Sequence, residues 1–174
     1  VTTWYDQSGE GNDATQAVTS SQPKIVDAGV LLKDANGKPE VVFDGSGHFL
    51  ERTLTLSQPV SMFSAYTALS NSSFVTGSSL SSLIFGRRYN GQYSMYAGVT
   101  IGSGTHISDQ VLASCLFNTT SSTGHWDGVE ILSGDVGTRT DFDYIGRNSS
   151  HYLDGSISEL IIYDSDQSSN RTGI

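Results

Sequence analysis

Cysteine is scarce in this chain: Cys115 is the only one among 174 residues. A single thiol cannot form an internal disulfide, nor can it supply the thiolate cluster of a structural zinc site. Because Cys115 lies in the apolar stretch 111–117, we expect a buried small hydrophobe rather than a reactive thiol. The length suits one ordinary domain with its own hydrophobic core. We therefore expect residues 1–174 to form a single domain, cut from a larger protein.

Positive charge and long apolar runs are also scarce. The chain has nine Lys and Arg residues and 18 Asp and Glu residues, which gives a formal charge of -9. This balance opposes the phosphate neutralisation that drives nucleic-acid binding, so we expect no nucleic-acid partner. Apolar runs such as Leu160-Ile161-Ile162 are far shorter than the roughly 20 residues that cross a bilayer. The sequence therefore predicts no membrane insertion.

Helical periodicity is absent, whereas short β-branched and aromatic runs recur between clusters of Gly, Ser, Asn and Asp. This alternation is typical of an all-β sandwich or barrel. The expected strands cover residues 40–44, 49–56, 60–69, 83–86, 92–99, 110–117, 124–132, 142–146 and 156–163. Both faces of 60–69 carry apolar residues, as in a central strand of a two-layer stack.

Turn residues separate these runs. Asn36-Gly37, Asn90-Gly91, Asp127-Gly128 and Asp154-Gly155 each supply the positive φ angles of a tight reversal. Residues 70–82 are rich in serine and predict a long loop, with one short strand at Phe74-Val75.

The opening segment carries the most specific motif. Residues 4–16 read Trp-Tyr-Asp-Gln-Ser-Gly-Glu-Gly-Asn-Asp-Ala-Thr-Gln, and residues 22–26, 42–45, 152–155 and 157–163 continue the pattern in order. This series resembles the laminin-G-like, concanavalin A-like jelly rolls of bacterial and phage-associated surface proteins. The resemblance implies a two-sheet antiparallel jelly-roll sandwich in an extracellular, cell-surface or virion setting, joined to neighbouring domains of a larger chain.

The same opening is similar to the catalytic-domain scaffold of fungal-type α-L-arabinofuranosidases. Retaining glycosidases need two carboxyl groups about 5 Å apart. Alignment to that family places the nucleophilic Glu at Ser81 and the partner Asp near Arg147-Asn148. Neither position is acidic here. The resemblance therefore implies the scaffold without its chemistry, and we expect no catalytic residues.

Other jelly-roll enzymes match poorly. The Glu-x-Asp-x-x-Glu strand of β-glucanases has no counterpart beyond Asp127 and Glu130, which flank a turn glycine, and the Gln-x-His of alginate lyases is missing. Histidines 48, 106, 125 and 151 lack ligand spacing. A glycoside hydrolase or polysaccharide lyase with an unrecognised acid pair stays open as an alternative.

The expected fold raises the question of a structural calcium ion, since related jelly rolls often hold one. Calcium prefers six to eight oxygen ligands. Asp6 and Asp44 occupy suitable loop positions, although Ser158 stands where relatives often place an acid. We expect no required cofactor, with Asp6 and Asp44 as the candidate ligands if calcium binds.

Two polar and aromatic segments follow the strands that correspond to the active-site strands of the enzyme scaffold. Their candidate ligand-binding residues are Arg87, Arg88, Tyr89, Asn90, Arg147, Asn148, His151 and Tyr152. Aromatic rings beside planar hydrogen-bond donors suit sugars, which present apolar faces and hydroxyl edges. The sequence thus predicts a non-catalytic carbohydrate-binding or adhesive module for a surface glycan or polysaccharide. A purely structural module of a phage virion or bacterial surface protein is the other alternative.

Overall fold

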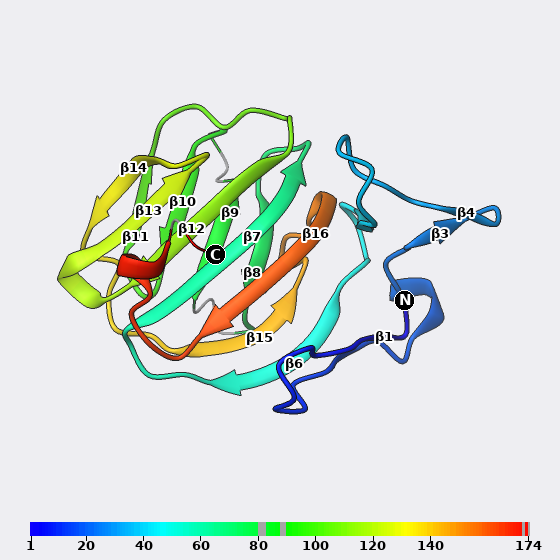
Figure 1. Cartoon of the computed structure of the whole chain (residues 1–174), viewed down its shortest axis with the longest axis horizontal. Helices are drawn as coiled ribbons and strands as arrows, with labels where there is room; N and C mark the ends of the chain where they lie inside the picture. The colour runs from blue at the N-terminus through cyan, green and yellow to red at the C-terminus, as the bar shows by residue number, and fades with distance from the viewer. Residues whose placement is uncertain (80–82, 88–89, 172, 174) are drawn as a thin grey trace.

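A computed structural model describes residues 1–79, 83–87, 90–171 and 173. Two antiparallel sheets lie face to face, with the six-stranded sheet in front of most of the eight-stranded sheet in Figure 1. The described residues contain three short 3-10 turns and no α-helix: η1 (Thr19–Ser21), η2 (Thr119–Ser121) and η3 (Ser168–Asn170). The predicted all-β, two-sheet jelly-roll sandwich is confirmed.

The eight-stranded sheet has the order β1-β2-β6-β15-β8-β9-β10-β11. Its strands are β1 (Thr3–Trp4), β2 (Ala14–Thr15), β6 (Leu50–Thr55), β15 (Asp141–Ile145), β8 (Ser73–Gly77), β9 (Ile84–Arg87), β10 (Tyr93–Tyr96) and β11 (Thr100–Ser103). Because β15 and β9 each pair antiparallel to β8, they run parallel to one another. Their carboxyl ends therefore reach the same edge of the sheet.

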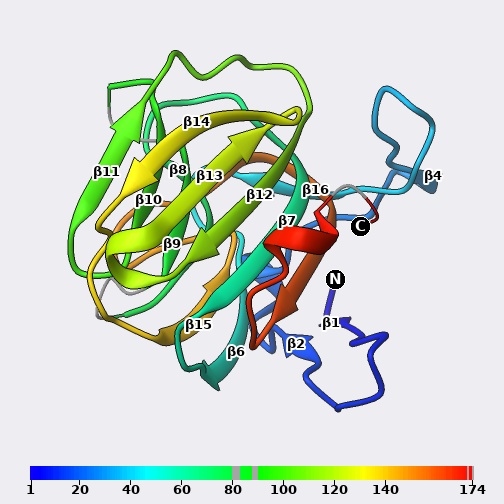
Figure 2. The ribbon, with the colours of Figure 1, turned by 60° about the vertical axis from the view of Figure 1, so that its left-hand side comes forward.

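The six-stranded sheet has the order β14-β13-β12-β7-β16-β5. Its strands are β14 (Val129–Gly134), β13 (Ser122–Trp126), β12 (Val111–Phe117), β7 (Val60–Ala68), β16 (Asp154–Tyr163) and β5 (Val41–Asp44). A separate hairpin, β3 (Val26–Asp27) with β4 (Val30–Leu31), projects from the body of the sandwich in Figures 1 and 2.

One hydrophobic cluster fills the space between the sheets. It takes side chains from both layers, such as Met62 and Phe117 from the six-stranded sheet and Leu50, Phe85 and Phe142 from the eight-stranded sheet. Each of these five side chains is at most 1% exposed. The period of two along a strand explains why alternate residues enter this core while their neighbours face outward.

A polar network lies inside the same core. The indole Nε1 of Trp126 donates to the hydroxyl oxygen of Tyr66 at 3.0 Å, and that hydroxyl lies 3.2 Å from Nε2 of His106. Burial raises the pKa of Tyr66 far above its ordinary value, so the phenol stays neutral. Neutral, hydrogen-bonded groups of this kind are tolerated in an apolar interior.

Two sequence predictions need correction. Asp154-Gly155 is not a turn: both residues belong to β16, where Gly155 pairs with Phe43 and Ala68. Glycine is required there because a Cβ would lie 2.0 Å from the carbonyl oxygen of Thr67. The expected strand 124–132 is two strands, β13 and β14, joined by the Asp127-Gly128 turn. Strand β11 was not predicted.

No helical segment among the described residues has the length and apolar character that spanning a bilayer requires.

Candidate functional site

The loop between β15 and β16 carries four of the predicted binding residues. Gly146, at φ +82°, turns the chain out of β15, and its amide donates to the carbonyl of Val75 at 2.8 Å. Arg147 then forms an antiparallel bridge with Tyr152. The sequence forms this tight loop because glycine accepts a left-handed conformation that costs other residues energy. Arg147 and Tyr152 are thus held side by side.

Asn148 holds the loop from within. Its side-chain oxygen accepts the backbone amides of Ser150 and His151 at 3.0 and 2.8 Å, and its own amide donates to the carbonyl of His151. This arrangement is an Asx-type turn, in which a short amide side chain substitutes for a backbone partner. Asn148 is 8% exposed, so its contribution is to shape the loop.

The guanidinium of Arg147 lies among three aromatic rings. Its Cζ is 4.4 Å from the ring centroids of Phe49 and Tyr144, and 5.0 Å from that of Tyr152. Its Nε donates to the carbonyl of Asn148 at 3.0 Å. Cations over ring faces at these distances are attracted by the ring quadrupole. We call Arg147 with Phe49, Tyr144 and Tyr152 the Arg147 cluster.

The cluster lies on the outer face of the eight-stranded sheet. Tyr144 pairs with exposed Glu51 and with Gly77, whereas the next residue, Ile145, is buried. Alternation along the strand therefore directs Tyr144 and Gly77 away from the core. A Cβ on Gly77 would lie 2.6 Å from the carbonyl oxygen of Arg147, so the loop rests directly on this glycine.

His151 lies at the exposed tip of the loop. Its Nδ1 is 2.9 Å from the hydroxyl of Ser150, and its ring packs edge-on to Phe74 with centroids 6.1 Å apart. The loop therefore offers an imidazole and a hydroxyl to solvent beside the cluster.

The second predicted segment follows β9. Arg87 ends that strand and pairs with Ser73 and Tyr93, while Arg88 and Tyr89 lie outside the described residues. Asn90 is exposed in the turn, and its amide nitrogen donates to Oε1 of Gln92 at 2.6 Å. Since only β8 separates the parallel strands β15 and β9, the two segments leave the same sheet edge about 10 Å apart.

The sequence did not predict Phe49 and Tyr144 as members of the site. A usable signal existed, because each aromatic residue directly precedes a buried aliphatic one, Leu50 and Ile145, at the start or end of a strand. Such a pattern places the ring on the outer face. Their meeting with Arg147, however, depends on the β6-β15 pairing, which sequence order does not reveal.

The acids weighed as a catalytic pair have other contacts. Asp127 accepts the backbone amide of Leu112 at 2.9 Å, and Glu130 on β14 lies 3.5 Å from Nε2 of His125 on the neighbouring strand β13. Ser81, where the enzyme scaffold has its nucleophile, lies outside the described residues. The described contacts of Arg147 are aromatic rings and backbone carbonyls, which have no acid or base role at neutral pH.

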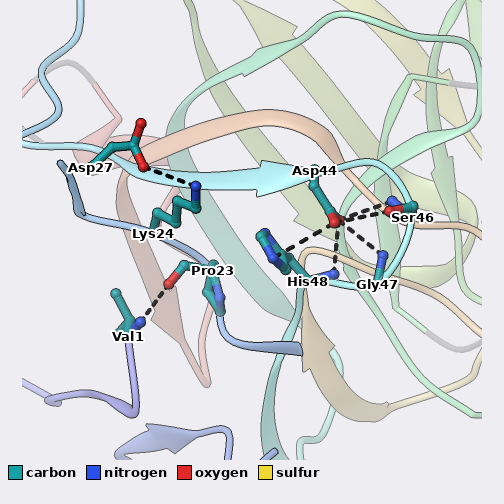
Figure 3. A network of polar contacts seen from close by, with 8 residues as sticks. All are labelled: Val1, Pro23, Lys24, Asp27, Asp44, Ser46, Gly47 and His48. Carbon is teal, nitrogen blue, oxygen red and sulfur yellow. Dashed lines mark hydrogen bonds and ion pairs between the residues drawn. The ribbon is translucent and has the colours of Figure 1, made fainter. Parts of the chain in front are cut away.

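Asp44 closes the loop after β5 (Figure 3). Its Oδ1 accepts the amides of Ser46, Gly47 and His48 at 2.9 to 3.0 Å, and Oδ2 accepts the Ser46 hydroxyl at 2.9 Å. Partial burial alone would raise the pKa of Asp44, but the amide hydrogen bonds outweigh it and hold the pKa well below its usual range. Ionised Asp44 therefore holds the loop of residues 44–48 in its folded conformation.

Asp6 likewise holds the loop of the opening motif through hydrogen bonds to its carboxylate. Its carboxylate accepts the Asn12 amide at 2.9 Å and both the amide and hydroxyl of Ser8 at 2.8 Å, which lowers its pKa. Asp6 lies in the loop after β1 of the eight-stranded sheet, whereas Asp44 ends β5 of the six-stranded sheet. In both residues the lone pairs of the carboxylate oxygens already accept N–H and O–H groups. Calcium would need the same lone pairs, so the two carboxylates fit the ion poorly. No cluster of three or more His, Cys, Asp or Glu suited to a metal occurs in the described part of the chain.

Comparison with known proteins gives a fold likeness and no family. The sequence matches no protein-family model and no curated protein. The structure is similar to Trypanosoma rangeli sialidase in complex with 2,3-difluoro-KDN (TM-score 0.65, 12% identity, 94% of this chain and 28% of that one). It is likewise similar to the same sialidase in complex with sialic acid (TM-score 0.64, 13% identity, 99% and 30%). The chain thus spans less than a third of the sialidase.

A looser likeness, at TM-score 0.48 and 11% identity, is to an alginate lyase of polysaccharide lyase family 7 and covers 89% of this chain and 90% of that one. A likeness at these identities concerns the fold alone. The Arg147 cluster presents a fixed cation and aromatic rings on this outer face, and the neighbouring Ser150 and His151 add a hydroxyl and an imidazole.

Proposed function

We propose that this chain is a non-catalytic carbohydrate-binding or adhesive module that recognises a glycan on a surface or polysaccharide. The observation that carries the proposal is the Arg147 cluster: three rings hold one guanidinium on the outer sheet face. The fold likeness to part of a glycan-processing enzyme supports it. An extracellular, cell-surface or virion setting, and neighbouring domains of a longer chain, belong to the same proposal.

The cluster favours a glycan with an acidic group. The ring faces toward Arg147 are already covered by the guanidinium, so they are not free to stack on a sugar. Stacking fixes the direction of the in-plane N–H groups of Arg147. Those that do not donate to the carbonyls of Asn148 and Ser149 can donate as a pair to a carboxylate or sulfate. Tyr152 and His151 would then contact hydroxyl groups beside the acid.

A glycan array that contains matched neutral and acidic glycans tests the proposal. Arg147→Met keeps the apolar stem and removes the cation, so we expect affinity for acidic glycans to fall by about tenfold or more. Arg139→Met is the matched control, because Arg139 also stacks on a tyrosine, Tyr96 at 5.6 Å, away from this loop. Equal loss in both variants would contradict a specific role for the cluster.

The same experiment separates the two alternatives. Mass spectrometry of the bound glycans would detect shortened products if the chain were a hydrolase or lyase, and product release would overturn the non-catalytic proposal. Absence of any glycan binding would favour the structural surface module instead.

A further inference from the structure

The outer face of the six-stranded sheet holds two adjoining hollows of about 230 and about 410 Å³. After β16 the chain returns across this face: the Gln167 amide donates to the Ser61 hydroxyl at 2.9 Å, and η3 lies over the strands in Figures 1 and 2. Phe63, Ser114 and Arg171 line both hollows. We call the joined space the Arg171 cleft.

Arg171 contributes an unsatisfied donor to the cleft. Its Nη1 is shielded from solvent and has no hydrogen-bond partner within the part of the chain that the structure describes. A guanidinium stays charged at all ordinary pH values, and a buried charged N–H without an acceptor is unfavourable. An anionic oxygen of a ligand bound in the cleft would supply the acceptor that Nη1 of Arg171 lacks.

The neighbouring charges limit what the anion can be. His125 and Arg171 line the same smaller hollow. Burial lowers the pKa of His125, and the positive charge of Arg171 lowers that pKa further. Glu130 lies 3.5 Å from His125, and Glu159 lines the larger hollow. With two carboxylates in the lining of an acidic protein, a single negative charge is tolerated better than two.

The rest of the lining is apolar with a few hydroxyls. Phe63 from β7 and Ile161 from β16 are paired neighbours on the outer face, and Leu112 from β12 is 55% exposed beside them. Ser114 and Thr123 add hydroxyl groups near the cation. Pockets of this mixture typically take a mostly apolar molecule that is oriented by one or two polar contacts.

We propose that the Arg171 cleft is a second ligand site, which binds a small organic monocarboxylate with an apolar body. The carboxylate accepts hydrogen bonds from Arg171, and the apolar body lies on Phe63 and Ile161. This site lies on the opposite sheet from the Arg147 cluster, so the proposal does not depend on glycan binding.

Titration of the whole chain with benzoate, followed by amide NMR shifts, tests the proposal. We expect saturable shifts around Ser114 and Thr123 with a Kd on the order of 1 mM, and binding of benzamide, which has the same shape without the charge, weaker by about tenfold. Inorganic phosphate should bind more weakly than benzoate. Equal affinity for benzoate and benzamide, or tighter phosphate binding, would overturn the assignment.

Variants locate the site. Arg171→Met retains the stem that covers the sheet and should reduce benzoate affinity by about tenfold, whereas Arg139→Met should leave it unchanged. If Arg171→Met fails to fold, Arg171→Lys keeps a cation and should retain saturable binding. Unchanged affinity in a folded Arg171→Met variant, or no saturation in Arg171→Lys, would refute the proposal.

Discussion

Replacing Gly77 by alanine tests the support of the Arg147 loop most directly. A Cβ there would lie 2.6 Å from the carbonyl oxygen of Arg147 and 2.8 Å from Cα of Asn148, below the 3.0 Å that real Cβ contacts respect. Both neighbours are backbone atoms, so neither can rotate aside. The loop is also pinned by the amide hydrogen bonds to Asn148. Either the loop or strand β8 must move.

The expected cost lies in the upper part of the range for overpacking, about 2–3 kcal/mol, because two backbone segments must give way together. For a chain of this length, each kcal/mol lowers the melting temperature by about 2–4 °C, so we expect a decrease of about 4–12 °C. Urea unfolding followed by tryptophan fluorescence measures the loss of free energy of unfolding, and thermal unfolding measures the melting temperature. Trp126 reports on both, since it is 2% exposed and loses its apolar surroundings on unfolding. The slope of the transition should stay unchanged.

Gly47→Ala is the matched control. Gly47 has an ordinary φ and no heavy atom within 4 Å of a Cβ, so the free energy of unfolding should stay within about 0.5 kcal/mol of the parent. If Gly77→Ala were as stable as Gly47→Ala, the Arg147 loop could not rest on Gly77 and the described geometry of the candidate site would be wrong. Under the proposed function, Gly77→Ala should also weaken glycan binding, while Gly47→Ala should not.

Three further predictions follow from polar groups. Asp44→Ala removes the acceptor of three amides and should cost about 1 kcal/mol at neutral pH by urea unfolding. Because the pKa of Asp44 is lowered in the folded protein, its stabilising effect is present above about pH 4 and is lost as the pH falls through the lower folded pKa. The free energies of unfolding of the parent and the variant should therefore converge in acid. A difference that stays constant with pH would contradict this. Tyr66→Phe leaves the Trp126 indole N–H without its acceptor in the core and should cost about 1–3 kcal/mol, measured in the same way against the parent; unchanged stability would show that another group accepts the indole. Asp6 and Asp44 are the candidate ligands if calcium binds, but their carboxylates already accept several hydrogen bonds. We therefore expect the same melting temperature in millimolar calcium and in chelator. A higher melting temperature in calcium would reveal a site.

Local sequence chemistry predicted much of the fold. Strands such as β7 and β12 were expected because β-branched and aromatic residues gather between turn residues. Strand β11 escaped because Thr100–Ser103 is short and polar and contains Gly102; it forms by pairing with β10 rather than by its own propensity. Asp154-Gly155 was wrongly predicted as a turn. Glycine is required there by a close backbone contact with Thr67, which is distant in sequence and cannot be recognised from the local pattern.

The sequence predicted only the part of the candidate site that lies in one continuous loop. Arg147 and Tyr152 share one loop, so a local pattern of polar and aromatic residues identified both. Phe49 and Tyr144 join them only because β6 pairs with β15, and eight strands, β7 to β14, lie between these two along the chain. Pairing between strands that are distant in sequence is set by the packing of the whole sandwich, and no local motif encodes it.

The placement of the two proposed sites leads to a final argument about independence. The Arg147 cluster lies on the outer face of the eight-stranded sheet, and the Arg171 cleft lies on the outer face of the six-stranded sheet, with the buried core between them. Packed sheets are about 10 Å apart, and substitutions separated by more than about that distance without shared partners usually have additive effects. Arg147→Met and Arg171→Met should therefore each affect one ligand only, and the double variant should lose both affinities by the same factors as the single variants. Coupling between them would mean that the core transmits changes from one sheet to the other.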